Sequence, residues 1–112
     1  MNNDKELLTL AAKAAGIELH HWCGDTFIRV SEYVDDAGGY WSPLTDDGDA
    51  LRLAVKLGLD VFHFDFKEPK GMQVWAAKPG NEAIRELLGN DPYAATRRAI
   101  VRAAAAIGRG ME

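Results

Sequence analysis

The stretch WSPLTDDGDALRLAVKLG, residues 41–58, contains the start, the body and the end of one amphipathic helix. Thr45, Asp46 and Asp47 each carry an oxygen that can accept a hydrogen bond from the free amides of a first helical turn, and Gly58 is typical of a helix end. Apolar residues recur between these ends with the helical period. We therefore predict a helix over residues 47–57, with acidic side chains at the positive end of its dipole.

The chain begins with a second helical pattern, over residues 4–15. Leucines and alanines recur there with a period near 3.6, Asp4 is placed to cap the first turn, and Gly16 ends the pattern. Ile17 follows the glycine, where an apolar residue often packs back on the helix it ends. The small alanine face predicts a close approach to a neighbouring element.

The C-terminal segment predicts a third helix. Asp91 is a good N-cap, Pro92 suits the first helical position, and Gly108 is expected to end the helix after residue 107. This segment is also locally basic: residues 91–112 carry four arginines against two acidic residues, whereas residues 1–90 carry nine basic residues against fifteen acidic ones.

Between the helices, four segments read as extended chain. Residues 60–67 alternate strictly and place Phe62, Phe64 and Phe66 on one face. A Pro-containing turn then leads to a partner strand, which predicts a β-hairpin. Two further segments are rich in β-branched or aromatic residues. The predicted strands are residues 26–34, a short piece at 40–41, 60–67 and 72–77.

For residues 81–88, the sequence does not decide between a short helix and a loop. The order of the elements predicts an α+β fold, a three-layer alpha-beta-alpha sandwich in which a small, mostly antiparallel sheet carries helices on both faces and buries its phenylalanine face. At 112 residues the whole chain, 1–112, is expected to form a single domain.

Composition limits the compartment and the class of protein. No apolar run approaches the roughly 20 residues needed to cross a bilayer, so no membrane association is expected. The first residues lack the basic and apolar regions of a secretory signal. Cys23 is the only cysteine, which excludes an intramolecular disulfide and fits a reducing cytoplasm. A net charge of −4 argues against a protein that coats nucleic acid.

His20, His21 and Cys23 are the one cluster of metal-ligand or nucleophile types. Adjacent histidines point in different directions in regular structure, and His63, the only other histidine, does not complete a zinc-like spacing. A small enzyme or a metal site at this cluster is therefore an alternative that we do not favour, and no metal is expected. The motifs GxGxxG, Walker A, GxSxG and HExxH are absent, so no cofactor and no catalytic residue is predicted.

The acidic run at the start of the 47–57 helix resembles a calcium loop, but the spacing fails. When Gly48 is aligned with the loop glycine, Ala54 occupies the position of the bidentate glutamate. Helix capping explains the carboxylates of Asp46, Asp47 and Asp49 more simply.

If the protein has a binding surface, two patches are the candidates. The first consists of the exposed start of the 47–57 helix together with an aromatic residue: Trp41, Asp46, Asp47 and Asp49. The second consists of arginines on the C-terminal helix: Arg97, Arg98 and Arg102. These arginines also permit nucleic-acid binding, which is not favoured because stacking aromatics and a wider basic surface are missing around them.

Two segments carry a resemblance to a known family: residues 41–57, WSPLTDDGDALRLAVKL, and residues 91–108, DPYAATRRAIVRAAAAIG. They resemble the phage alpha-beta-alpha sandwich domain family, small phage and prophage proteins, and more faintly the NinX-like phage proteins. The resemblance implies a three-layer sandwich encoded by a phage or prophage and hence a bacterial cytoplasm, and it brings no activity or catalytic residue.

These observations lead to a working hypothesis. The chain is a non-enzymatic phage or prophage accessory protein that binds a host or phage protein. The sequence leaves open whether it also forms a homo-oligomer.

Overall fold

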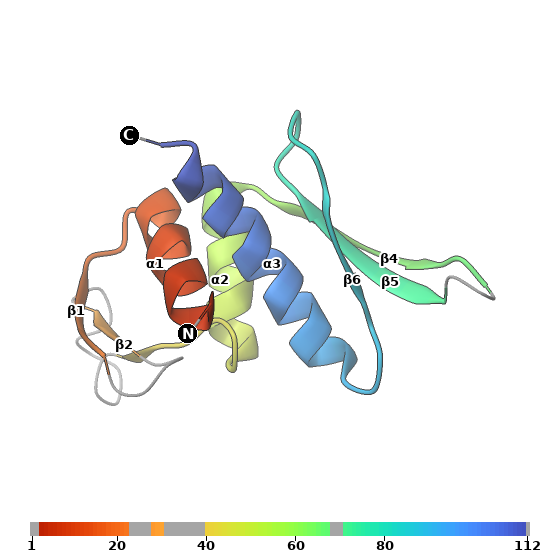
Figure 1. The fold of residues 1–112 in the computed structure, drawn as a ribbon, viewed down its shortest axis with the longest axis horizontal. Helices are drawn as coiled ribbons and strands as arrows, with labels where there is room; N and C mark the ends of the chain where they lie inside the picture. The colour runs from red at the N-terminus through yellow and green to blue at the C-terminus, as the bar shows by residue number, and fades with distance from the viewer. Residues whose placement is uncertain (1–2, 23–27, 31–39, 68–70, 112) are drawn as a thin grey trace.

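The computed structural model describes residues 3–22, 28–30, 40–67 and 71–111. Within these residues, three helices pack side by side, with one small antiparallel sheet on either side of them (Figure 1). The helices are α1 (Asn3–Ala15), α2 (Asp47–Leu57) and α3 (Pro92–Arg109). The strands are β1 (Leu19–Trp22), β2 (Ile28–Val30), β3 (Tyr40–Trp41), β4 (Asp60–Asp65), β5 (Met72–Ala77) and β6 (Ile84–Leu87).

The α+β class is confirmed, as are the three predicted helices and the β4–β5 hairpin. The two sheets have the strand orders β1-β2-β3 and β4-β5-β6, and every pairing within them is antiparallel. The first sheet packs beside α1, where Lys5 lies 5.1 Å above the ring of Trp22, and the second packs on α3. No helix among the described residues is long and apolar enough to span a membrane.

Helices α1 and α3 approach each other closely at Gly108. A Cβ placed on Gly108 of α3 would lie 2.0 Å from the carbonyl oxygen of Leu10 in α1. Alanines make up most of the buried residues around this contact, so the two backbones approach without a layer of large side chains. The predicted close approach of the alanine face of α1 is therefore confirmed.

Two helix ends differ from the prediction. Helix α3 continues through Gly108 and ends at Gly110, because Gly108 serves the contact with α1 and does not stop the helix. Helix α1 begins at Asn3, so Asp4 lies within the first turn, where its carboxylate accepts a hydrogen bond from Arg98 at 3.0 Å. The other end of α1 is as predicted: Gly16 has φ +72°, and the amide of Ile17 donates to Ala12 at 2.9 Å.

The strands also differ from the prediction in part. Residues 84–87 form β6, neither the helix nor the loop considered for residues 81–88, because β5 offers this segment a second edge with which to pair. Strand β1 was not predicted. Within the predicted strand 26–34, residues 28–30 form β2, and the remainder lies outside the described residues.

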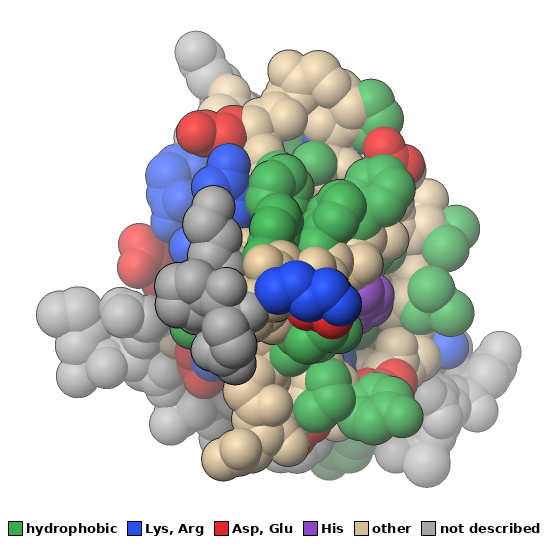
Figure 2. All heavy atoms as spheres, turned by 90° about the vertical axis from the view of Figure 1, so that its right-hand side faces the viewer, with side chains coloured by type: hydrophobic (Ala, Val, Ile, Leu, Met, Phe, Trp, Pro, Cys, Tyr) green, Lys and Arg blue, Asp and Glu red, His purple; other side chains and the backbone are tan. Residues whose placement is uncertain are grey.

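The predicted burial of the phenylalanine face is wrong. Helix α3 packs on the opposite face of the β4-β5-β6 sheet, where Val74 and Ala76 are fully buried. Phe62 and Phe64 remain 51% and 37% exposed, because no described helix covers their side of the sheet. Figure 2 looks onto this end of the molecule and shows hydrophobic side chains gathered at its surface.

The α1–α3 contact yields a first prediction. We expect Gly108→Ala to lower the free energy of unfolding by about 2–3 kcal/mol, because the new methyl group overlaps the Leu10 carbonyl and forces the helices apart. Gly110→Ala is the matched control, since its Cβ would meet nothing closer than 3.6 Å, and we expect a change below about 0.5 kcal/mol. Urea denaturation of both variants measures the difference. Equal stability of the two would contradict the close contact.

Candidate functional site

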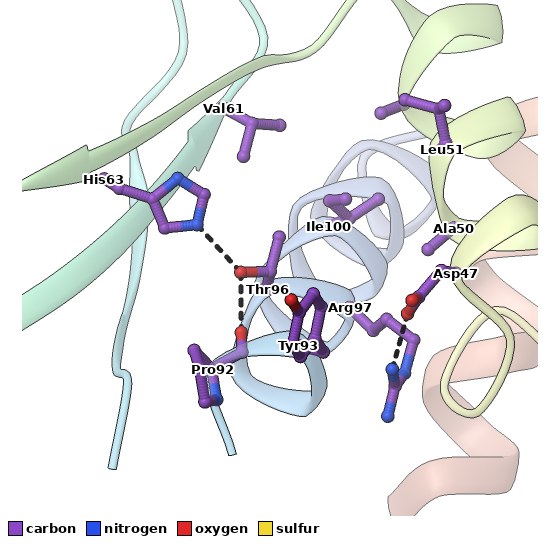
Figure 3. A pocket seen from close by; sticks show the side chains of 11 residues that line it. Asp47, Ala50, Leu51, Val61, His63, Pro92, Tyr93, Thr96, Arg97 and Ile100 are labelled. Carbon is purple, nitrogen blue, oxygen red and sulfur yellow. Dashed lines mark hydrogen bonds and ion pairs between the residues drawn. The ribbon is translucent and has the colours of Figure 1, made fainter. Parts of the chain in front are cut away.

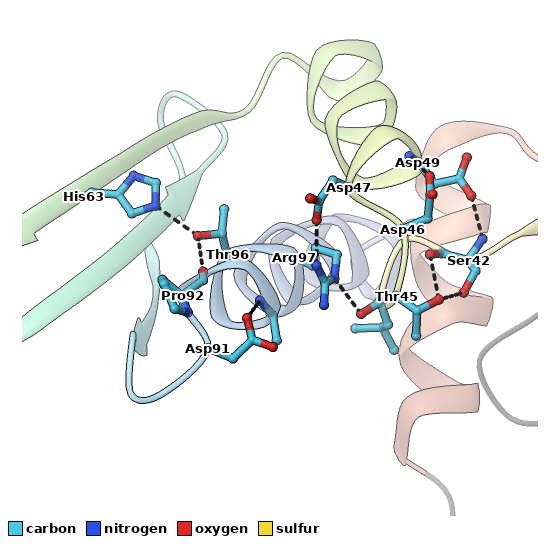
Figure 4. Close-up of polar contacts among 12 residues, drawn as sticks. Ser42, Thr45, Asp46, Asp47, Asp49, His63, Asp91, Pro92, Thr96 and Arg97 are labelled. Carbon is cyan, nitrogen blue, oxygen red and sulfur yellow. Dashed lines mark hydrogen bonds and ion pairs between the residues drawn. The ribbon is translucent and has the colours of Figure 1, made fainter.

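The acidic start of α2 is a local hydrogen-bond network. Asp46 is the N-cap, chosen from the three predicted candidates, and its carboxylate accepts from the amide of Asp49 at 2.8 Å (Figure 4). The carboxylate of Asp49 accepts from the amide of Ser42 at 2.9 Å and from the Arg52 guanidinium at 2.6 Å. Asp49 is only 6% exposed, so it holds the chain before α2 in place and is not a surface residue.

Trp41 does not belong to a binding surface. Its side chain is fully buried in the core cluster that joins α1, α2 and α3. The chain before α2 packs against the helices, and the large ring of Trp41 fills the space between them. The first predicted patch therefore reduces to Asp46 and Asp47 at the surface.

The three arginines of the second predicted patch do not form one basic surface. Arg98 pairs with Asp4 of α1, and Arg102 donates to Glu86 of β6 at 2.5 Å. Arg97 turns toward the start of α2, where it donates to the carbonyl of Leu44 at 2.9 Å and to Asp47 at 2.6 Å. Each arginine is thus paired with a different element.

The structure does bring together one residue from each predicted patch. The ion pair between Asp47 and Arg97 lies at the rim of a groove of about 520 Å³ between α2, α3 and β4 (Figure 3), which we call the α2–β4 groove. Its lining residues are mostly apolar. They are Asp47, Ala50, Leu51, Ala54, Val61, His63, Pro92, Tyr93, Thr96, Arg97 and Ile100.

The groove is shaped by the turn between α2 and β4. Helix α2 ends at Gly58, whose left-handed conformation (φ 68°, ψ 37°) turns the chain directly into β4. The two elements then diverge, with α3 as the floor between them. Small residues on α2, Ala50 and Ala54, leave the space open.

One polar contact crosses the groove. His63 Nε2 lies 2.9 Å from the hydroxyl oxygen of Thr96, and that hydroxyl donates to the carbonyl of Pro92 at 2.8 Å. The hydroxyl has a single hydrogen, so when it donates to Pro92 it accepts from His63 Nε2–H. A base that activated Thr96 would instead have to accept this hydrogen.

Sequence reasoning did not identify the groove. Tyr93, Thr96 and Ile100 recur with helical spacing in the last helix, and the alternation in β4 separates Val61 and His63 from the phenylalanines. These two patterns are the signals in the sequence from which the lining of the groove could have been found. Only the packing of β4 beside α3 places the two sets opposite each other.

The His20, His21 and Cys23 cluster is only partly described. The backbone of the two histidines belongs to β1, whereas their side chains, and Cys23 as a whole, lie outside the described residues. Within the part of the chain that the structure describes, no three side chains of His, Cys, Asp or Glu are grouped as metal ligands.

A second apolar surface lies on the far side of the β4-β5-β6 sheet, which we call the outer face. Phe62, Phe64, Phe66 and Trp75 form a chain of ring contacts there, with centroids 5.0 Å apart between Phe64 and Trp75. Arg85 of β6 lies over the ring of Trp75 at 4.5 Å. The outer face is thus a small cluster of aromatic side chains that contact one another, and Phe62 and Phe64 in it are exposed.

Comparison with known proteins adds no relative: no family model, no curated protein and no solved structure matches this chain.

The network before α2 yields a second prediction. We expect Asp49→Ala to lower the free energy of unfolding by about 1–3 kcal/mol, because it leaves the buried amide of Ser42 without an acceptor. Asp46→Ala removes the helix cap and an exposed ion pair with Arg52, and it should cost about 1 kcal/mol.

Asp47→Ala is the control for both, since its side chain is exposed and its pairing with Arg97 should contribute less than about 1 kcal/mol. Thermal melts followed by circular dichroism measure all three. If Asp49→Ala is no worse than Asp47→Ala, the buried carboxylate does not hold the chain before α2.

Proposed function

We propose that this protein is a binding module that holds an apolar segment of a partner protein in the α2–β4 groove. The observation that carries the proposal is an apolar groove of about 520 Å³ that leaves Leu51 and Tyr93 63% and 67% exposed at its rim. Exposed apolar surface rimmed by polar groups is typical of interaction sites. The charges at the rim, on Asp47 and Arg97, are already paired with each other.

The resemblance to small phage and prophage proteins supports a biological setting for this activity. In that setting the chain is a phage or prophage accessory protein acting in the cytoplasm of a bacterial host, and its partner is a host or phage protein. The paired arginines and the apolar groove favour a protein partner over nucleic acid, whose phosphates need unpaired basic groups along a groove.

An enzymatic role is less supported by the groove. The hydroxyl of Thr96, the one hydroxyl close to His63 among the lining residues, donates to the carbonyl of Pro92 in its own helix. The same groove, however, offers an apolar floor and two flanking elements, which suit the burial of a partner's side chains.

A pair of matched leucine variants tests the proposal. Leu51→Asp places a charge at the rim of the α2–β4 groove, whereas Leu87→Asp makes the same change at a leucine of β6 that is 67% exposed and does not line the groove. We expect Leu51→Asp to weaken partner binding at least tenfold, because the partner's apolar segment must then desolvate a carboxylate.

The measurement is affinity capture from a bacterial lysate, followed by titration of the purified partner that is recovered. Leu87→Asp should bind as the unaltered chain does. Equal binding by the two variants, or no saturable partner of the unaltered chain, would refute the groove as a protein-binding site.

A further inference from the structure

We propose that the partner segment in the α2–β4 groove is an extended strand that pairs with the free edge of β4 and lengthens the β4-β5-β6 sheet by one strand. This inference rests on the function proposed above and specifies how the partner is recognised. It identifies the partner's chemistry as a β-forming segment with uncharged, apolar side chains.

Strand β4 is an edge strand. It stands at the end of its sheet, and of the described strands only β5 pairs with it. Unpaired backbone amides and carbonyls along a strand edge form a template for another strand.

The backbone groups of every second residue of β4 point to the free edge of the sheet. The amide of Phe66 donates to the carbonyl of Gly71 at 3.0 Å, across the hairpin from β4 to β5. Since antiparallel strands direct their backbone groups alternately toward and away from the partner, those of Val61, His63 and Asp65 are directed away from β5. The exposed edge of β4 thus offers three donors and three acceptors at regular spacing.

The free edge of β4 lies along the α2–β4 groove. Val61 and His63, two of the residues with outward backbone groups, also line the α2–β4 groove (Figure 3). A strand added about 4.8 Å from β4 would direct every second side chain toward α2 and α3, where Ala50, Ala54 and Ile100 leave apolar space.

The remaining side chains of an added strand would lie on the outer face. There they would extend the aromatic cluster beyond Phe62 and Phe64, which are exposed on β4. On the groove side, the Asp47–Arg97 ion pair neutralises the rim and Lys67 pairs with Asp65 at the end of β4. The surroundings of Val61, Phe62, His63 and Phe64 in β4 therefore favour apolar side chains on both faces of the partner strand.

Two other occupants fit less well. A helix bonds its own backbone internally and would leave the three outward backbone pairs of β4 without partners. A second copy of this chain could pair through its own β4. This pairing would bring the α2 helices of both copies beneath the joined edges, and one α2 already occupies that space as the wall of the groove.

The test begins with a defined probe. Random twelve-residue peptides displayed on yeast are selected on the full chain, and the recovered peptides are synthesised and titrated by fluorescence anisotropy. We expect peptides with β-branched or apolar residues that bind at least tenfold more weakly to Leu51→Asp than to Leu87→Asp.

Two variants at one position then separate the backbone contribution from that of the side chain. His63→Pro removes an amide that points to the free edge, a position where an edge strand tolerates proline, and His63→Ala keeps the amide. We expect His63→Pro to weaken peptide binding at least tenfold more than His63→Ala does, because both variants lose the imidazole and only the proline also loses the amide, with circular dichroism confirming that both fold.

Methylation of single peptide amides gives a readout that does not depend on folding of a variant. Strand addition predicts that methylation weakens binding at every second peptide position along the paired segment. A three-to-four-residue period, the absence of any period, or failure to select a peptide would overturn strand addition.

The outcomes also separate this inference from the proposed function. Peptides that depend on Leu51 but show no two-residue period would leave the groove as a protein-binding site and refute the strand. Self-association of the chain that His63→Pro abolishes would identify a second copy as the occupant and refute a foreign strand.

Discussion

The close contact between α1 and α3 is the constraint on which the rest of the structure depends. Gly108 and the alanines around it let the α3 backbone reach the carbonyl of Leu10, so α3 becomes the central element of the fold. Helix α1, helix α2 and the β4-β5-β6 sheet all pack against it. A larger residue at 108 would move α3 away from α1 and displace every element that α3 positions.

The α2–β4 groove follows from how α2 is attached to this central helix. Arg97 of α3 binds Leu44 and Asp47, which holds the start of α2 against α3. At the other end of α2, Lys78 donates to the carbonyl of Leu57 at 2.6 Å beside the Gly58 turn. With both ends held, α2 and β4 can diverge over the floor of α3 without closing on each other. The groove therefore follows from the fixed helix ends together with the small residues of α2 that line it.

Charge pairing explains why the surfaces that remain for recognition are apolar. The arginines that a linear reading places together are separated by their partners on α1, α2 and β6. Among the described residues, the α2–β4 groove and the aromatic outer face then remain as exposed apolar surfaces. Both border β4, which makes this strand the centre of the proposed interaction surface and gives a partner strand two apolar faces to meet.

Short-range signals in the sequence determined most of the elements, because caps and alternation act within a few residues. Asp46, Gly58 and Asp91 set helix ends correctly, and the alternation of residues 60–65 identified β4. Tertiary structure decided the rest. Strand β6 exists because β5 had a free edge, and Asp4 meets Arg98 across 94 positions of sequence. Alternation states which residues share a face of a strand, but only packing decides which face is covered, and so the phenylalanines are exposed while Val61 and His63 line the groove.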